Sequence, residues 1–319
     1  MGQAAGRRHR PGQKEDAIVA DRTIRPPVVG LVSAGQMGST LGGALLRGGA
    51  TVLTSVAGRS DRTAGLAARA GLELADGLDD VVRRSEVLLS VVPPQEARTA
   101  GADLIERARR LGVRPVLADL NAVSPAEVGE LAALAAAAGL TFVDGAVSGA
   151  PPGTGTAAPR LLLSGRDASV VAELPWTGVA VSVVSDRPGA ASAAKMCTGG
   201  VRKGVTALLI NALLTAAEHG VLEPVEAELR RALKRDPLVE VELAAAKAWR
   251  FAPEMDAVAA TQAAAGLDPA TYRAIAEVFR RTATSELAER RPEDVERLGT
   301  DVDAAVRRAA VAAALRARP

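Results

Sequence analysis

Hydrophobic and polar positions divide the chain into two halves. From residue 28 to about residue 184, short runs rich in β-branched residues alternate with alanine-rich stretches of helical periodicity. The runs PVVGLV, TVLTSVA, EVLLSVV, PVLADL and LTFVDGA predict strands, and RLLLSG and VAVSVV are further candidates. Between two of these runs, Ser124, Pro125 and Glu127 predict a capping box that starts a helix. This alternation is typical of an α/β fold with a doubly wound, mostly parallel sheet.

The strand pattern stops after the sequence SDRPGA. From Ala190 onward the chain shows only helical periodicity, which is broken at EPVE, RDP, APE, LDP and RPED. We expect the boundary near Arg187 to Gly189. The chain would then consist of an α/β domain over residues 28–187 and an all-helical domain over residues 188–319, preceded by a tail over residues 1–27.

Composition and charge are typical of a globular protein without a large basic surface. Hydrophobic residues make up 48% of the 319 residues, which is ample for a buried core. The tail over residues 1–27 holds six basic and three acidic residues, which leaves 33 basic and 34 acidic residues in the body. A near-neutral body argues against nucleic acid as the main partner. We expect the basic tail to be disordered, as a solvated extension rather than an arm that binds nucleic acid.

The sequence carries no signal for secretion or for a membrane. The tail lacks the apolar core of about 7–15 residues that a secretory signal needs. The run from Val205 to Ala217, 13 residues long, is too short to span a bilayer. The single cysteine, Cys197, cannot form a disulfide within the chain, and we expect it to be packed in the core. A cytoplasmic protein with no membrane partner is therefore expected.

The segment VVGLVSAGQMGST carries most of the glycine fingerprint of a dinucleotide-binding turn. In G-x-G-x-x-G, the second glycine lets the backbone approach the pyrophosphate and the third lets helix and strand pack closely. Gly35 and Gly38 fill these positions, while Ser33 replaces the first glycine and can serve if its φ stays negative. The expected cofactor-binding turn therefore consists of Ser33, Ala34, Gly35, Gln36, Met37 and Gly38.

The end of the second predicted strand favours NADP over NAD. An NAD enzyme has an acidic residue about 20 residues beyond the glycines, where it accepts hydrogen bonds from the ribose hydroxyls. Here the sequence reads Gly58, Arg59, Ser60, and Arg59 stands about 21 residues beyond Gly38. A guanidinium beside a small hydroxyl suits a 2′-phosphate. We therefore predict NADP binding through Arg59 and Ser60, the alternative being a solvated loop arginine.

Six motifs, taken in order, resemble those of the β-hydroxyacid dehydrogenase superfamily. They are SAGQMG, GRS after the second strand, VVPP after EVLLS, DLNAVSP, DGAVSGA, and a lysine early in the next helix. This superfamily includes 6-phosphogluconate dehydrogenase and hydroxyisobutyrate dehydrogenase, and imine reductases are close relatives. The resemblance covers about Val28 to Thr215. The helical remainder looks like a bacterial subgroup whose C-terminal domain is known only as 6-phosphogluconate-dehydrogenase-like.

The resemblance implies a Rossmann domain and roles for several residues within it. Val92 and Pro93 would line the nicotinamide riboside of the cofactor. Asn121 would stand where a serine commonly borders the cofactor and the substrate. Ser148 and Gly149, followed by an alanine, match the family's S-G-G, whose serine and backbone amides hold a substrate carboxylate.

The segment GAASAAK resembles the family's G-x-G-x-x-x-K, which makes Lys195 the expected general acid/base. A lysine whose pKa is lowered by partial burial can exchange the proton that accompanies hydride transfer. The family usually continues K-x-x-N-N, but here Thr198 and Gly199 replace the asparagines. On a helix, Gly199 and Arg202 share a face with Lys195, at about 40° and about 20° from it. We therefore expect Thr198, Gly199 and Arg202 at the substrate. Either Gly199 makes room for a bulkier substrate whose anionic group Arg202 binds, or ordinary hydroxyacid chemistry is lost.

The sequence thus predicts an NADP-dependent oxidoreductase that transfers a hydride to or from a small, anionic, hydroxy-acid-like substrate. The alternatives are an imine reductase and a non-catalytic NADPH-binding protein. Two histidines, His9 and His219, cannot build a metal site. We expect the helical domain to bind substrate and to form a homodimer. The family's helical domains pair, and the run from Val205 to Ala217 has more apolar surface than one small bundle hides.

Overall fold

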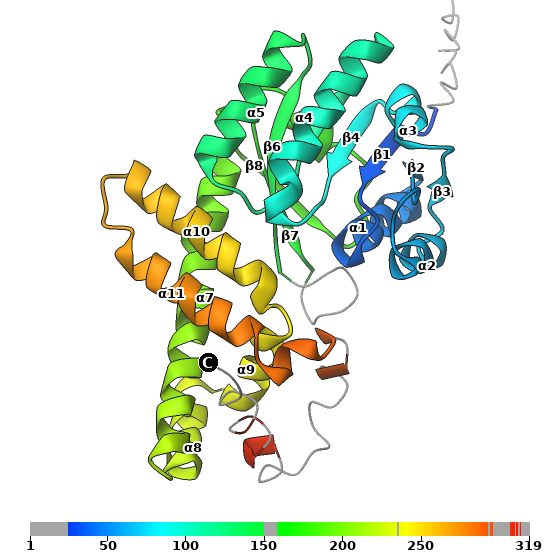
Figure 1. Ribbon diagram of the computed structural model, residues 1–319. Coiled ribbons are helices and arrows are strands. Elements are labelled where there is room, and N and C mark those ends of the chain that lie inside the picture. The colour runs from blue at the N-terminus through cyan, green and yellow to red at the C-terminus, as the bar shows by residue number, and fades with distance from the viewer. Residues whose placement is uncertain are drawn as a thin grey trace, which may run out of the picture.

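The computed structural model describes residues 25–149, 158–234, 236–292, 294–295, 307–309, 311 and 313. Figure 1 shows this part as an α/β unit joined to a group of helices that lie along one long helix. Most of the basic tail lies outside the described residues, and so does the alanine that follows Gly149. The expected disorder of the tail therefore stays a prediction.

Within the described ranges, eight strands form one sheet in the order β3-β2-β1-β4-β5-β6-β7-β8. They are β1 (Val28–Val32), β2 (Thr51–Thr54), β3 (Glu73–Leu74), β4 (Val87–Ser90), β5 (Val116–Asp119), β6 (Phe142–Ser148), β7 (Arg160–Ser164) and β8 (Ala180–Ser185). Neighbouring strands are parallel except β6 and β7. The order of the strands reverses between β1 and β4, which is where sheets of this kind bind dinucleotides. The expected doubly wound, mostly parallel sheet is confirmed.

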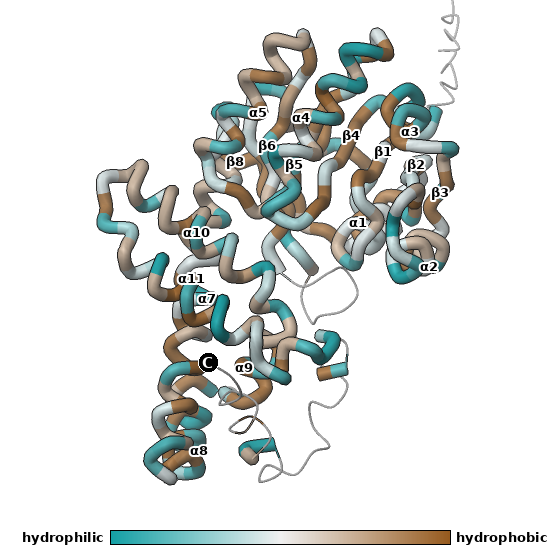
Figure 2. Tube along the Cα trace, in the orientation of Figure 1, coloured by the Kyte–Doolittle hydropathy of each residue, from teal (hydrophilic) through white to brown (hydrophobic). Residues whose placement is uncertain are grey.

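Helices cover both faces of this sheet. They are α1 (Gln36–Arg47), α2 (Asp61–Arg69), α3 (Leu78–Arg84), α4 (Pro94–Leu111), α5 (Pro125–Ala137) and α6 (Ala168–Ala172). One hydrophobic cluster contains Leu41 of α1 and Val29 of β1. Another contains Leu104 of α4 and Val28, because successive side chains of a strand point to opposite faces. Because helices cover both faces of the sheet, β1 is buried along its whole length. Figure 2 shows that the strands are mostly hydrophobic.

The second half is helical, as the sequence predicts. It contains α7 (Ala190–Glu218), α8 (Leu222–Leu233), α9 (Pro237–Ala245), α10 (Ala248–Ala264), α11 (Ala270–Ala283) and a 3-10 helix, η1 (Glu286–Glu289). Helix α7 contacts β6, β7 and β8 near its start and then packs against α10 and α11 (Figure 1). Because α7 contacts both the sheet and the other helices, it fixes the helical half to the sheet. The expected boundary falls in the connection between β8 and α7.

The start of α5 has the hydrogen bonds of the capping box that the sequence predicts. Ser124 Oγ accepts a hydrogen bond from the Glu127 N–H at 3.3 Å, and a Glu127 carboxylate oxygen accepts one from the Ser124 N–H at 2.9 Å. Pro125 follows as the first helical residue. The predicted capping box is therefore confirmed.

The expectation that Cys197 is packed in the core is wrong. Its side chain is exposed, whereas the preceding residue, Met196, is 2% exposed. Neighbouring residues of a helix point about 100° apart, so Met196 faces the core and Cys197 faces away from it. No helix in the described part of the chain is long and apolar enough to cross a membrane.

Candidate active site

The predicted cofactor and substrate residues lie at one edge of the sheet. Strands β1, β4, β5 and β6 are parallel neighbours, so their carboxyl ends meet at the same edge. The turn from Ser33 to Gly38 follows β1, Val92 and Pro93 follow β4, and Asn121 follows β5. Ser148 is the last residue of β6. The fold thus brings together segments that are far apart in the sequence.

The two glycines of the first turn answer two different demands. A Cβ on Gly38 would lie 2.0 Å from the Ser33 carbonyl oxygen, so close packing of the turn on α1 requires glycine there. A Cβ on Gly35 would have no protein atom within 4 Å. Gly35 is the N-cap of α1, with φ −66° and no side-chain hydrogen bond at the cap. This uncapped helix start beside open space fits the pyrophosphate of a dinucleotide, which such turns bind through backbone N–H groups.

The other residues of the turn are buried or half-buried. Ala34 is 1% exposed, and Met37 packs against the hydrophobic cluster on this face of the sheet. Ser33 and Gln36 are half-buried. Among the described residues other than glycine, only Lys234 has a positive φ, so Ser33 meets the condition under which it can replace the first glycine.

Arg59 and Ser60 lie just before α2, beyond the carboxyl end of β2. Arg59 is exposed, and its side chain has no hydrogen bond or ion pair with any residue that the structure describes. Ser60 is the N-cap of α2, and its Oγ accepts a hydrogen bond from the Thr63 N–H at 3.4 Å. Asp61 opens α2, so a carboxylate does stand near the end of the second strand, two residues beyond Arg59. Arg59 is free to bind an anion at this helix start.

Asn121 holds the turn after β4 in place. Its side chain is buried, and its Oδ1 accepts a hydrogen bond from the Val92 N–H at 2.7 Å. Its Nδ2 donates to Ser90 Oγ at 3.0 Å and to a carboxylate oxygen of Asp119. Because both amide hydrogens are used within the protein, Asn121 can meet a ligand only through the remaining lone pair of Oδ1 or through its backbone.

Two buried carboxylates beneath this edge have no assigned role in the sequence analysis. Asp119 of β5 and Asp144 of β6 are paired in the sheet register. Asp119 is 1% exposed, and its Oδ2 has no hydrogen-bond partner among the described residues. Burial, together with the nearby charge of Asp144, raises the pKa of Asp119 to about 7, although hydrogen bonding by Asn121 lowers it.

Asp144 anchors the start of α7. Its Oδ2 accepts hydrogen bonds from the N–H groups of Gly189 and Ser192 at 3.0 and 3.1 Å and from Ser164 Oγ at 2.8 Å. Its Oδ1 accepts one from Ser192 Oγ at 2.7 Å. A carboxylate is favoured at a helix start, where unpaired N–H groups and the helix dipole meet it. The sequence signal for this role is an aspartate inside an otherwise apolar strand, LTFVDGA.

Lys195 lies one turn further along α7, next to the end of β6. Its Nζ donates a hydrogen bond to the Val147 carbonyl oxygen, so its ammonium lies beside Ser148. Burial lowers the pKa of Lys195 to about 8, and the charges of Lys203, Arg250 and Arg202 also lower it, while Glu254 opposes them. The structure thus brings Lys195 and Ser148 together at the carboxyl edge of the sheet.

An ion pair that the sequence analysis did not identify lies beside Lys195. Lys203 Nζ bonds to the carboxylate of Glu254 from α10, and their side chains are 14% and 7% exposed. Burial raises the pKa of Glu254, but the charges of Lys203 and Lys195 outweigh it and hold this pKa below the ordinary value. Lys203 Nζ lies 3.6 Å from the position of a Cβ on Gly199. The space next to Gly199, where the family has an asparagine side chain, therefore contains an ammonium group.

Thr198 and Arg202 do not point into this cluster. Both are exposed, and the Thr198 hydroxyl donates back to the Ala194 carbonyl oxygen of its own helix at 2.9 Å. Arg202 has the weakest effect on the pKa of Lys195 among the four charges named above. Their contacts with a substrate stay predictions.

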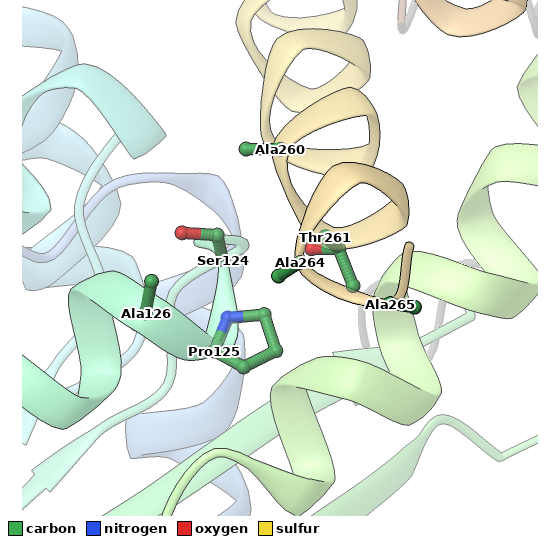
Figure 3. A pocket seen from close by; sticks show the side chains of 7 residues that line it. All are labelled: Ser124, Pro125, Ala126, Ala260, Thr261, Ala264 and Ala265. Carbon is green, nitrogen blue, oxygen red and sulfur yellow. The ribbon is translucent and has the colours of Figure 1, made fainter. Parts of the chain in front are cut away.

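A separate hollow of about 220 Å³ lies between the start of α5 and α10 (Figure 3). It is lined by Ser124, Pro125, Ala126, Ala260, Thr261, Ala264 and Ala265. No charged side chain lines it, and we assign it no chemistry. Across the described ranges, no three His, Cys, Asp or Glu side chains are placed to hold a metal ion.

Both halves of the chain contain segments that match known protein domains. Residues 28–175 match the NAD binding domain of 6-phosphogluconate dehydrogenase, and residues 216–282 match a domain of unknown function (DUF1932). A solved structure of a conserved protein of unknown function, described as similar to 3-hydroxyacid dehydrogenases, is 28% identical to this chain, with a TM-score of 0.59. The similarity covers 85% of this chain and 99% of that one.

Two enzymes share the fold at lower identity. A 3-hydroxyisobutyrate dehydrogenase from Mycobacterium tuberculosis, solved with L-serine, is 18% identical, with a TM-score of 0.64 over 86% of this chain and 100% of its own. An imine reductase from Pseudomonas sp. is 18% identical, with a TM-score of 0.53 over 86% of this chain and 99% of its own.

The expected family resemblance is therefore confirmed. The glycine turn and strands β1 to β7 all lie within residues 28–175, the segment that matches the NAD binding domain. The chain therefore combines a segment that matches the NAD binding domain of 6-phosphogluconate dehydrogenase, over residues 28–175, with one that matches a domain of unknown function, over residues 216–282.

Proposed function

We propose that this protein is an NADP-dependent oxidoreductase that acts on a small, anionic, hydroxy-acid-like substrate. NADPH, when bound, supplies a hydride to the reacting carbon, and NADP+ accepts one in the reverse direction. The residues that would hold the cofactor are the turn from Ser33 to Gly38, Arg59 with Ser60, and the turn of Val92 and Pro93. Their support is the open helix start at Gly35 and the unpaired guanidinium of Arg59.

The observation that carries this proposal is the place and state of Lys195. Reduction of a carbonyl needs a proton for the oxygen, and oxidation of a hydroxyl needs a base that takes one away. An amine with a pKa near the working pH can do both. Burial lowers the pKa of Lys195 to about 8, and the side chain is fixed by its hydrogen bond to the Val147 carbonyl oxygen. Ser148 lies next to this ammonium and would hold the substrate carboxylate.

An imine reductase is the second candidate. The observation in its favour is the absence of the family's asparagine at Gly199, together with the neighbouring Lys203–Glu254 pair, which alters the proton donors around the reacting atom. A protein that binds NADPH without turnover is the third possibility.

The cofactor preference is tested by titrating NADPH and NADH against the wild type and Arg59→Ala. Losing one charge-assisted phosphate contact costs about 1.5–3 kcal/mol, so the variant should bind NADPH about 10- to 100-fold more weakly. NADH affinity should not change. Arg69→Ala is the matched control, because Arg69 is an exposed arginine at the other end of α2. Equal affinity of the wild type for both cofactors would refute the NADP assignment.

The reaction is tested with hydroxy acids, the corresponding oxo acids and cyclic imines as substrates. Lys195→Ala should keep its NADPH affinity and lose about 10²- to 10⁴-fold in kcat, which is what general acid/base catalysis supplies. Turnover of imines alone would select the imine reductase. Cofactor binding without turnover of any substrate would select the non-catalytic protein, and full kcat in Lys195→Ala would remove the lysine from the mechanism.

We further infer that the protein works in the cytoplasm as a homodimer. Its single cysteine suits a reducing compartment. Val201 and Leu208 of α7 are 62% and 67% exposed, and seven residues apart they lie on one face of the helix. A second copy of the chain that packs against this face would cover these apolar side chains.

A further inference from the structure

The start of α10 presents a half-buried arginine, Arg250. Its side chain makes no hydrogen bond or ion pair with any residue that the structure describes. Its guanidinium carbon lies 5.5 Å from the centre of the Phe251 ring. Stacking on an aromatic face leaves the N–H groups at the edge of the guanidinium free to bind an oxyanion.

The Phe251 ring is a fixed support. It packs edge to face against Phe279, with ring centres 5.3 Å apart and an interplanar angle of 75°, and Phe279 is fully buried. Lys203 Nζ also lies over the Phe251 ring, 5.0 Å from its centre. The two cations over this ring differ in their partners. Lys203 is paired with Glu254, whereas Arg250 forms no ion pair with any carboxylate in the described part of the chain.

Arg250 also lies close to the proposed reaction centre. It lies over the same Phe251 ring as Lys203, and it stands four residues before Glu254, on the same face of α10. The residue before it, Trp249, has its carbonyl oxygen 3.5 Å from Gln95 Nε2, at the start of α4. That helix follows the turn of Val92 and Pro93. The start of α10, which carries Arg250, therefore lies against the start of α4, whereas Arg202 is exposed on α7.

The charges around Lys195 do not balance. Three cations act on the pKa of Lys195, namely Lys203, Arg202 and Arg250. Of the described groups that act on it, only Glu254 is a carboxylate. Glu254 is already engaged by Lys203. The surplus of positive charge is therefore available to a ligand, and a half-buried arginine gains most from an anion, since little water competes for it.

We propose that Arg250 binds a second anionic group of the substrate, so that the substrate is a small hydroxy acid with two anionic groups. This rests on the proposed function, in which Ser148 holds the first carboxylate beside Lys195. The second group is a carboxylate or a phosphate, both of which a guanidinium binds through two parallel hydrogen bonds. The role that the sequence suggests for Arg202 belongs instead to Arg250.

The test measures binding of three acids to the protein loaded with NADPH, by isothermal titration. Tartronate has two carboxylates, 3-phosphoglycerate has a carboxylate and a phosphate, and lactate has a single carboxylate. All three are already at the alcohol level, so NADPH cannot reduce them and binding is measured without turnover. We expect at least one dianion to bind 10-fold or more tightly than lactate, and which one it is identifies the second group.

Variants then separate Arg250 from its neighbours. Arg250→Gln should weaken the preferred dianion 10- to 100-fold and leave lactate within 3-fold of the wild type, while Arg250→Lys, which keeps the charge, should lose less. Arg202→Gln tests directly whether the second anion is bound by Arg202 instead of Arg250. Arg273→Gln is the matched control and should change neither affinity, because Arg273 is an exposed arginine on α11 with no assigned role. Thermal melting and NADPH titration of each variant show that it is folded and loaded.

Several results would overturn the inference. These are no preference of the wild type for either dianion, an equal loss of lactate in Arg250→Gln, or the same loss in Arg202→Gln. Failure of the proposed function gives a different pattern. In that case dianion binding still depends on Arg250, but hydride transfer is absent from the wild type with every substrate tried.

Discussion

Substituting the two glycines of the first turn separates cofactor binding from folding. Gly35→Ala places a methyl group where no protein atom lies within 4 Å, whereas Gly38→Ala places one 2.0 Å from the Ser33 carbonyl oxygen. If the open space in front of Gly35 is where a pyrophosphate approaches, the first change blocks the cofactor and spares the fold. The second change forces the turn away from α1.

The magnitudes follow from these contacts. Gly35 has φ −66° and ψ −172°, which alanine adopts without strain. Alanine is a poorer N-cap than glycine by about 0.5 kcal/mol, but it lowers the entropy of the unfolded chain by a similar amount, so the two effects nearly cancel. Gly38→Ala overpacks the turn and should cost about 1–3 kcal/mol or more. For NADPH, losing one charge-assisted contact at the pyrophosphate weakens binding about 10- to 100-fold.

The assay combines thermal melting of the cofactor-free protein with titration of NADPH fluorescence. Gly35→Ala should melt within about 3 °C of the wild type and bind NADPH at least about 10-fold more weakly. Gly38→Ala should melt several degrees lower. If Gly35→Ala bound NADPH within twofold of the wild type, the turn would not be the pyrophosphate site. If it melted as low as Gly38→Ala, the space around Gly35 would be needed by the protein itself.

Three further predictions concern the lysine, the helix start and the assembly. Burial lowers the pKa of Lys195 to about 8, so the rate of reduction by NADPH should be highest below this pH. The rate should fall as the pH rises through this value, because the ammonium loses the proton that it must donate. A pH–rate profile of kcat with no such fall would contradict this role. Asp144→Asn should lower the free energy of unfolding by about 1–3 kcal/mol, because the amide NH2 group would face the N–H and O–H donors of Ser192 without accepting from them. Urea denaturation measures this change, and an unchanged midpoint would refute the anchoring role. The double variant Val201→Asp, Leu208→Asp should be a monomer near 32.6 kDa by light scattering while the wild type is a dimer, and a monomeric wild type would exclude the homodimer.

Features that depend on neighbouring residues could be read from the sequence. The period of the strands, the capping box at Ser124 and the glycine turn follow from side-chain alternation, a three-residue spacing and backbone geometry, and all of these are local. One strand that the sequence did not predict shows that this prediction depends on a local hydrophobic pattern. Strand β3, Glu73–Leu74, was not predicted, because it has two residues that are both exposed and so carries no hydrophobic pattern.

Features that depend on how the elements dock were decided only by the tertiary structure. Lys203 and Glu254 pair across 51 residues, and Asp144 reaches Ser192 across 48. No spacing rule predicts such contacts, because they require the packing of α10 on α7 and of α7 on the sheet. Helical periodicity placed Arg202 on the face of Lys195, but only the packing of α10 shows that Arg250 lies over the same Phe251 ring as Lys203. Sequence identified the lysine from its motif, and only the fold determined which charges surround it.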